Sequence, residues 1–283
     1  MRDEQFDPFP AGAVDINVHY GPDVVPRSQT AAESVRLATE LALTGYCLRS
    51  HTGSTVDIAN ALNALSDSVE IVGALTLNTP VGGINPEAVD VALRTGARMI
   101  SLPTWDAEGE TAPPLRRRAP VPVMDSNDLC LPEVDEVFAM VAEANVCLDI
   151  GIALAQHVLP LIRRARFHGV TRIIVSHPFY AAQRYPLQLQ MAAVEAGAMI
   201  EHCYMQFDPG YPRNAEIKTL AHHVRQLGAS HVVLSSDSGK DQFPTLRRAL
   251  VMFHRLLQRT CSDDELTRMF VENPSELLGL ASR

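Results

Sequence analysis

Short apolar runs rich in β-branched residues alternate with longer amphipathic stretches along the whole chain. Eight of these runs are continuously hydrophobic, which is the pattern of parallel strands that are covered on both faces. Their predicted bounds are 12–19, 45–50, 70–77, 97–103, 145–151, 171–177, 198–204 and 231–237. The pattern therefore predicts an α/β fold with eight strands.

The stretches between the predicted strands carry helix signals. Thr30 and Glu33 form a capping box, and Gly45 stops that helix. Asn85 and Pro86 supply an N-cap and a proline at the first helical position. Further helices are predicted at 132–145, 155–168, 186–196, 214–227 and 244–259.

Strand–helix units in this number close most simply into a (β/α)8 TIM barrel, predicted as a single domain over residues 1–283. The alternative is an open doubly wound sheet, but no G-x-G-x-x-G turn follows the first strand. Residues 104–131 are rich in Pro, Asp and Arg, and we expect a lid loop there or else a surface insertion. Residues 262–283 are predicted to form a C-terminal helical extension.

Composition and charge narrow the class of protein. Hydrophobic residues make up 46% of the 283 residues and charged residues 20%, as in globular proteins. The net charge of −9 argues against a nucleic-acid partner, and no apolar run is long enough to cross a bilayer. We expect no secretory signal in the acidic amino-terminal segment, and five cysteines without a C-x-x-C pair fit poorly with a disulfide framework. We expect a cytoplasmic protein without nucleic-acid or membrane partners, which associates into homo-oligomers.

Polar side chains gather at the carboxyl ends of the predicted strands, which converge on one mouth in a barrel. Imidazoles and a carboxylate in such a place suit a Zn²⁺-like ion or a general acid/base pair that works near neutral pH. These strand-end residues are His19, Arg49, His51, Asn78, His177, His202 and Asp237.

Side-chain direction assigns first roles within this set. We expect His202 to point into the mouth, so that strand alternation turns Glu201 toward the helices. Arg49 is expected to hold an anionic substrate group through its planar fork, or else to pair with Glu201 or Asp237 inside the barrel.

Several short motifs follow one another along the chain. They are Asp15-Ile16-Asn17-Val18-His19, Arg49-Ser50-His51, Ser176-His177-Pro178, Ile200-Glu201-His202, Ser235-Ser236-Asp237-Ser238-Gly239 and Asn273-Pro274-Ser275-Glu276-Leu277-Leu278-Gly279. Together they resemble the amidohydrolase-like metal-dependent hydrolases, and more narrowly a poorly characterised bacterial family of hydrolase-like barrels within that superfamily. The resemblance spans almost the whole chain, in the right order.

The resemblance implies a TIM barrel that hydrolyses an amide, lactam or ester, with His19, His177 and Asp237 as metal ligands. Three positions depart from the family pattern. Asn17 replaces the first histidine of the His-x-His motif, Ile152 replaces a histidine at the end of strand five, and Arg49 replaces a lysine before the strand-two histidine. Each lost imidazole weakens a metal site, so we expect one divalent ion (Zn, Mn or Fe) or none.

The leading hypothesis is an enzyme that hydrolyses a small, polar, anionic molecule. Asp237, His202 and His51 are its candidate catalytic residues, and Arg49, Asn17 and Asn78 its candidate substrate-binding residues. The first alternative is a metal-independent lyase, isomerase or cyclase that uses the same groups as acid and base. The second is an inactive barrel that serves as a binding or regulatory subunit, although so many polar groups are costly to bury without use.

Overall fold

The computed structural model describes residues 9–66, 68–110, 119–180, 184–211 and 215–280. Parts of the predicted lid loop (111–118) and of the C-terminal extension (281–283) lie outside these residues. Within the described part, no helix is both long enough and apolar enough to cross a membrane.

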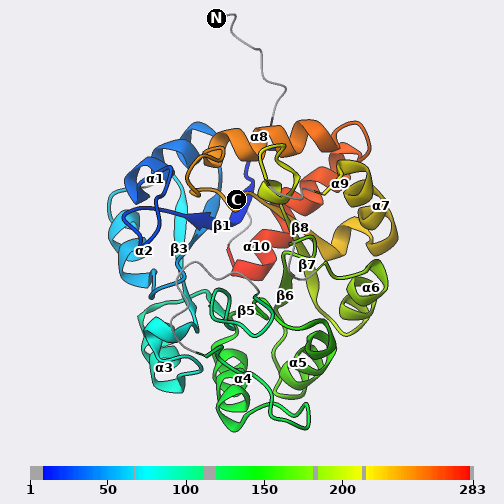
Figure 1. Cartoon of the computed structure of the whole chain (residues 1–283). Coiled ribbons are helices and arrows are strands. Elements are labelled where there is room, and N and C mark those ends of the chain that lie inside the picture. Colours follow the sequence, from blue (N-terminus) through cyan, green and yellow to red (C-terminus); the bar gives the residue numbers. More distant parts are fainter. Residues whose placement is uncertain (1–8, 67, 111–118, 181–183, 212–214, 281–283) are drawn as a thin grey trace, which may run out of the picture.

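Eight parallel strands form one sheet in sequence order, and β8 returns to β1 (Figure 1). The closure includes a backbone hydrogen bond of 2.9 Å from the His19 amide to the Ser238 carbonyl. The predicted (β/α)8 TIM barrel is therefore confirmed, with shorter strands than the sequence pattern suggests. The strands are β1 Val14–His19, β2 Gly45–Arg49, β3 Glu70–Thr76, β4 Met99–Ser101, β5 Cys147–Asp149, β6 Ile173–Ser176, β7 Met199–Cys203 and β8 Val232–Ser235.

Helices surround the barrel, one after each strand, and α9 and α10 follow the eighth of these helices (Figure 1). The capping box of Thr30 with Glu33 and the Asn85 N-cap are both present. The helix α2, which is not among the predicted helices, has no capping hydrogen bond at Thr55. The helices are α1 Ala31–Glu40, α2 Val56–Asn63, α3 Pro86–Thr95, α4 Pro132–Ala144, α5 Ala155–Phe167, α6 Leu187–Glu195, α7 Ile217–Leu227, α8 Leu246–Leu257, α9 Asp263–Thr267 and α10 Asn273–Leu278.

The hydrophobic core has two layers. One lies between the barrel and its helices. The other fills the barrel interior near the amino ends of the strands, with side chains such as Ile16, Cys47 and Ile174. Leu277 and Leu278 of α10 belong to the inner layer, so this helix covers the end of the barrel at which the strands begin.

Toward the carboxyl ends of the strands the inward-facing side chains become polar. They form one layer above the apolar interior, and each is buried. This layer is the floor of the barrel mouth, where the candidate site lies. Its members are Asn17, Arg49, Ser101, Asp149, Ser176, Glu201, Cys203 and Ser235.

Gly73 of β3 provides a test of how α2 docks on the barrel. A β-carbon at this position would lie 2.4 Å from Cα of Val56, the first residue of α2. We expect Gly73→Ala to lower the free energy of unfolding by about 1–3 kcal/mol, because backbone cannot yield as a side chain does. Urea unfolding followed by circular dichroism measures the change. Gly53→Ala is the control, since no atom lies within 4 Å of its added carbon. Equal midpoints for the two variants would contradict this packing.

Candidate active site at the barrel mouth

The carboxyl ends of the strands open into a cavity of about 520 Å³. This volume is typical of sites for small molecules. Most of the predicted site residues line it, and Ile152 lines it as well. The predicted residues at the cavity wall are Asn17, His19, Arg49, His51, His177 and Asp237.

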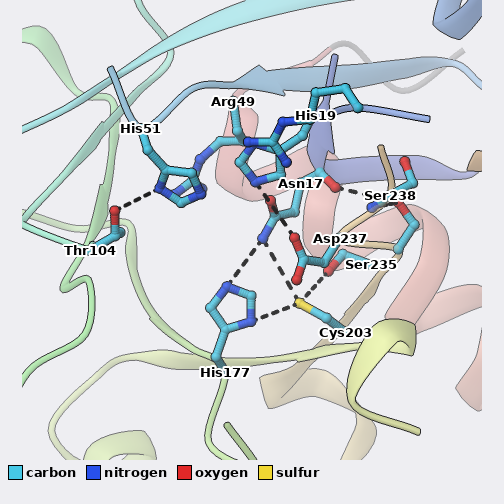
Figure 2. A network of polar contacts seen from close by, with 12 residues as sticks. Asn17, His19, Arg49, His51, Thr104, His177, Cys203, Ser235, Asp237 and Ser238 are labelled. Atoms are coloured by element: carbon cyan, nitrogen blue, oxygen red, sulfur yellow. Dashed lines mark hydrogen bonds and ion pairs between the residues drawn. The ribbon is translucent and has the colours of Figure 1, made fainter. Parts of the chain in front are cut away.

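His19 and Asp237 form a pair within the cavity. Nε2 of His19 lies 3.5 Å from Oδ1 of Asp237, and both side chains are buried (Figure 2). Burial, followed by the charge of Arg27, lowers the pKa of His19 well below 6.5, so the imidazole is neutral at pH 7. Burial also raises the pKa of Asp237, against the opposing effects of nearby cationic groups. The pair therefore combines a neutral imidazole with a carboxylate that is a stronger base than usual.

Two of the predicted site residues have unusual backbone conformations. Asp237 has a φ angle of 50° and His177 one of 58°, which is the left-handed region that ordinary residues rarely adopt. Strain of this kind is held only where the surroundings enforce it, and it clusters at functional sites. Both side chains line the cavity. The strain thus coincides with the polar part of the mouth.

His51 is held between two rings. Its imidazole stacks on His19 at 4.7 Å and on Trp105 at 4.0 Å. Nδ1 lies 2.8 Å from the hydroxyl of Thr104, which accepts a hydrogen bond of 2.9 Å from the Asn78 amide (Figure 2). The hydroxyl hydrogen of Thr104 is then free to bond Nδ1. This arrangement favours the His51 tautomer that carries its proton on Nε2.

Asn78 does not line the cavity, which corrects its predicted role. Its amide nitrogen donates to the His51 carbonyl and to Thr104, at 3.0 and 2.9 Å. Its oxygen accepts from the backbone nitrogens of Thr104 and Asp106, at 2.9 and 3.2 Å. The side chain has no remaining donor or acceptor for a substrate. Asn78 instead fixes the loop that carries Thr104 and Trp105.

Arg49 lines the cavity, but its charge is already balanced. Nη2 of Arg49 lies 2.6 Å from Oδ2 of Asp149 and 2.9 Å from the hydroxyl oxygen of Ser101. Arg49 therefore pairs with Asp149, and the predicted pairing with Glu201 or Asp237 is wrong. Burial opposes ionisation of Asp149, but the charge and hydrogen bond of Arg49 outweigh it and hold its pKa below the ordinary value.

The structure reverses the predicted directions of His202 and Glu201. Glu201 points into the barrel, where Oε1 accepts hydrogen bonds from Asn17 (3.3 Å) and Ser235 (2.6 Å). His202 is fully buried on the opposite side of β7, with its ring 5.1 Å from that of Phe179. In the described part of the chain neither of its ring nitrogens has a hydrogen-bond partner. Burial lowers the pKa of His202 to about 3, so it is a neutral packing residue outside the cavity.

Several lining residues carried no strand-end signal. Trp105 is the one tryptophan of the chain, and it lies with Thr104 and Glu110 at the start of the predicted lid loop. Tyr180 also lines the cavity and donates a hydrogen bond of 2.8 Å to Glu110. Lys240 lies at the rim, with Nζ 5.6 Å from the ring centre of Tyr211. These residues lie in loops, and the hydrophobic periodicity of the sequence does not predict the path of a loop.

The predicted metal ligands do not converge as a set. Among the described residues, one group of His, Cys, Asp and Glu side chains has its ligand atoms within 4.8 Å of one another: His177, Glu201 and Cys203. His19 and Asp237 are not in that group. His177 is thus shared between the predicted set and the observed cluster, and the other two members come from β7.

The chain is a (β/α)8 barrel with a polar cavity at the carboxyl ends of its strands. Its fold resembles a probable 2-pyrone-4,6-dicarboxylic acid hydrolase from Acinetobacter baumannii with citric acid bound (13% identity, TM-score 0.63, 95% of this chain and 100% of that one). An amidohydrolase from Pseudomonas aeruginosa is also similar (9% identity, TM-score 0.66, 95% and 97%). Another similar structure is an amidohydrolase from Burkholderia multivorans with bound HEPES (12% identity, TM-score 0.60, 96% and 100%).

More narrowly, the chain belongs to the family of unknown function DUF6282, which matches residues 12–201. No curated protein matches the sequence.

His202 offers a test of the assignment on β7. The unfolded chain protonates this histidine near pH 6.5, whereas the folded protein does so only near pH 3. Stability is therefore lost as the pH falls below 6.5, by about 2 kcal/mol between pH 8 and pH 5. We expect His202→Leu to remove this part of the pH dependence, as measured by urea unfolding at both values. His222→Leu, at an exposed position of α7, is the control. Parallel pH profiles for wild type and His202→Leu would contradict the assignment.

Proposed function

We propose that the cavity hydrolyses an amide, lactam or ester of a small, polar, anionic molecule, with at most one divalent metal. The observation that carries this proposal is the pair of Asp237 with a neutral His19 inside the cavity. Burial raises the pKa of this carboxylate above its ordinary value, which makes it a stronger base toward a water molecule. The named relatives of this fold, which include hydrolases, support the same reaction type.

The roles follow from the side chains that face the substrate space. Asp237 takes one proton from a water molecule, and the water oxygen attacks the carbonyl carbon. The bond from that carbon to the leaving nitrogen or oxygen then breaks, and the leaving atom takes the proton from Asp237. The Nε2–H of His51, set by Thr104, is the donor available for the carbonyl oxygen, on which negative charge develops. A bound divalent metal would supply further polarisation of that carbonyl or a more acidic water.

Preference for an anion rests on Lys240, a cationic side chain in the cavity wall. Arg49 is paired with Asp149, and Nε of Arg27 donates a hydrogen bond of 2.7 Å to Asp23. Lys240 forms no ion pair among the residues that the structure describes, and it packs against aromatic rings instead. We therefore assign the substrate anion to Lys240 and not to Arg49. The similar barrel named for a dicarboxylic acid agrees with an anionic substrate.

A metal-independent lyase, isomerase or cyclase is the second candidate. Asn17 and Ile152 line the cavity where the family pattern has imidazoles, and this observation favours acid–base chemistry without a metal. The two candidates differ in their products, because hydrolysis adds the elements of water to the substrate and the alternative reactions do not. A hydrolysed lactone or ester also releases a proton near neutral pH.

Replacement of Asp237 tests the proposed hydrolysis. A panel of lactones, lactams, esters and amides that bear a carboxylate is screened by titration of released acid and by mass spectrometry. For the substrate found, we expect Asp237→Asn to lower kcat by about 10²- to 10⁴-fold, since the general base is lost. Asp90→Asn, on the exposed face of α3, is the control. Wild-type turnover by Asp237→Asn would remove this residue from the mechanism.

Lys240 makes a second prediction with a different kinetic signature. We expect Lys240→Gln to raise KM about 10- to 100-fold with little change in kcat, because it removes a charge-assisted contact present throughout the reaction. Steady-state kinetics with the same substrate measures both constants. Lys218→Gln, at an exposed position of α7, should behave as wild type. An unchanged KM for Lys240→Gln would place the substrate anion elsewhere.

A further inference from the structure

A cluster of possible metal ligands lies in the floor of the cavity. A ring nitrogen of His177, a carboxylate oxygen of Glu201 and the sulfur of Cys203 lie within 4.8 Å of one another. Glu201 and Cys203 have no exposed surface, and His177 reaches them from the cavity wall. Nδ1 of His177 lies 3.2 Å from the Cys203 sulfur (Figure 2). The cluster thus combines nitrogen, oxygen and sulfur donors, two of them fully buried.

The amide of Asn17 lies beside all three members of this cluster. Its Nδ2 lies 3.5 Å from Nε2 of His177, 3.3 Å from Oε1 of Glu201 and 3.9 Å from the sulfur of Cys203 (Figure 2). A tetrahedral site with bonds of about 2.0–2.3 Å separates its donor atoms by roughly 3.3–3.8 Å. The Asn17 amide is therefore spaced from the other three groups as the ligands of one small cation are.

Buried oxygens without partners point to the same place. In the described part of the chain, Oδ1 of Asn17, Oε2 of Glu201 and Oε1 of Gln206 have no hydrogen-bond donor. Buried oxygens left in this state are costly, most of all on a carboxylate. A half-turn of the Asn17 amide exchanges Nδ2 for Oδ1 and presents that oxygen to the cluster.

Gln206 supports the orientation of the histidine. Its Nε2 lies 2.9 Å from Nδ1 of His177. The same half-turn brings the free Oε1 of Gln206 to this position, where it accepts a hydrogen bond from Nδ1–H. Nε2 of His177 is then unprotonated and available to a metal. An outer hydrogen bond on the second ring nitrogen is the usual support of a metal-binding histidine.

We propose that Asn17 Oδ1, His177 Nε2, Glu201 and Cys203 bind a single zinc ion beneath the barrel mouth. Mixed nitrogen, oxygen and sulfur ligands in fourfold arrangement are those that zinc prefers. The Cys203 thiol releases its proton to solvent as the Zn–S bond forms. The thiolate and the Glu201 carboxylate then balance the charge of Zn²⁺, which a buried site requires.

This site differs from the set that the resemblance implies, because it uses two β7 residues in place of His19 and Asp237. It deepens the proposed function, on whose cavity it rests, by naming the ligands of its metal. Zinc binding is measured without turnover. Failure of the zinc site can therefore be distinguished from failure of the proposed hydrolysis.

The thiolate gives the site a spectroscopic signature. The purified full-length chain is stripped with chelator, dialysed and titrated with Zn²⁺ or Co²⁺. We expect about one equivalent of bound metal, and for Co²⁺ a near-ultraviolet band from charge transfer between sulfur and metal. The set of His19, His177 and Asp237 contains no sulfur and gives no such band. A folded wild-type protein that binds no metal, or binds Co²⁺ without this band, overturns the proposal.

Variants then identify the ligands. We expect Cys203→Ala to lose the band, and Glu201→Gln to weaken metal binding by more than about 100-fold, since a ligand matters more than the residues that support it. His19→Gln and Asp237→Asn are the controls that should retain the metal. Circular dichroism checks the fold of each variant. If Cys203→Ala does not fold, the Co²⁺ spectrum of the wild-type protein shows whether sulfur is a ligand. Loss of metal in the controls and its retention in Cys203→Ala would assign the ion to the other set.

Discussion

The buried ion pair of Arg49 with Asp149 is the contact on which the barrel mouth depends. A guanidinium inside a barrel is tolerated only when its charge is paired and its hydrogens are bonded. Asp149 accepts further hydrogen bonds of 3.0 Å from the hydroxyl of Ser176 and from the backbone of Gly151. These contacts join β2, β4, β5 and β6 across the barrel. They also mark the height at which the apolar interior ends and the cavity begins.

The other half of the barrel carries a matching network. Glu201 accepts hydrogen bonds from Asn17 of β1 and Ser235 of β8, and Cys203 contacts His177 after β6. In the first network Arg49 balances the charge of Asp149. In this second network no cationic side chain of the described residues bonds the Glu201 carboxylate. The asymmetry explains why a metal is expected at this side of the floor. It also leaves His19, His51 and Asp237 above the floor, free to act on a substrate.

Periodicity was sufficient to predict the fold, because parallel strands covered on both faces leave long apolar runs between capped helices. The strand-end rule also placed five of its seven residues at the cavity: His19, Arg49, His51, His177 and Asp237. It failed at β7, where Glu201 and His202 are adjacent and both polar. Burial is complete on both sides of that strand, so no apolar alternation reveals which of the two faces inward. The roles of Asn78, Thr104 and Trp105 depend on a loop whose path no strand pattern describes.

The measurement that tests the central claim most directly is turnover in water enriched in ¹⁸O. The substrate found by screening is converted by the wild-type enzyme in a single turnover, and the product mass is determined. Hydrolysis at this mouth predicts that the product gains the elements of water and that one solvent oxygen enters the new carboxylate. A product of unchanged composition without ¹⁸O would contradict the account and assign the cavity to acid–base chemistry without hydrolysis.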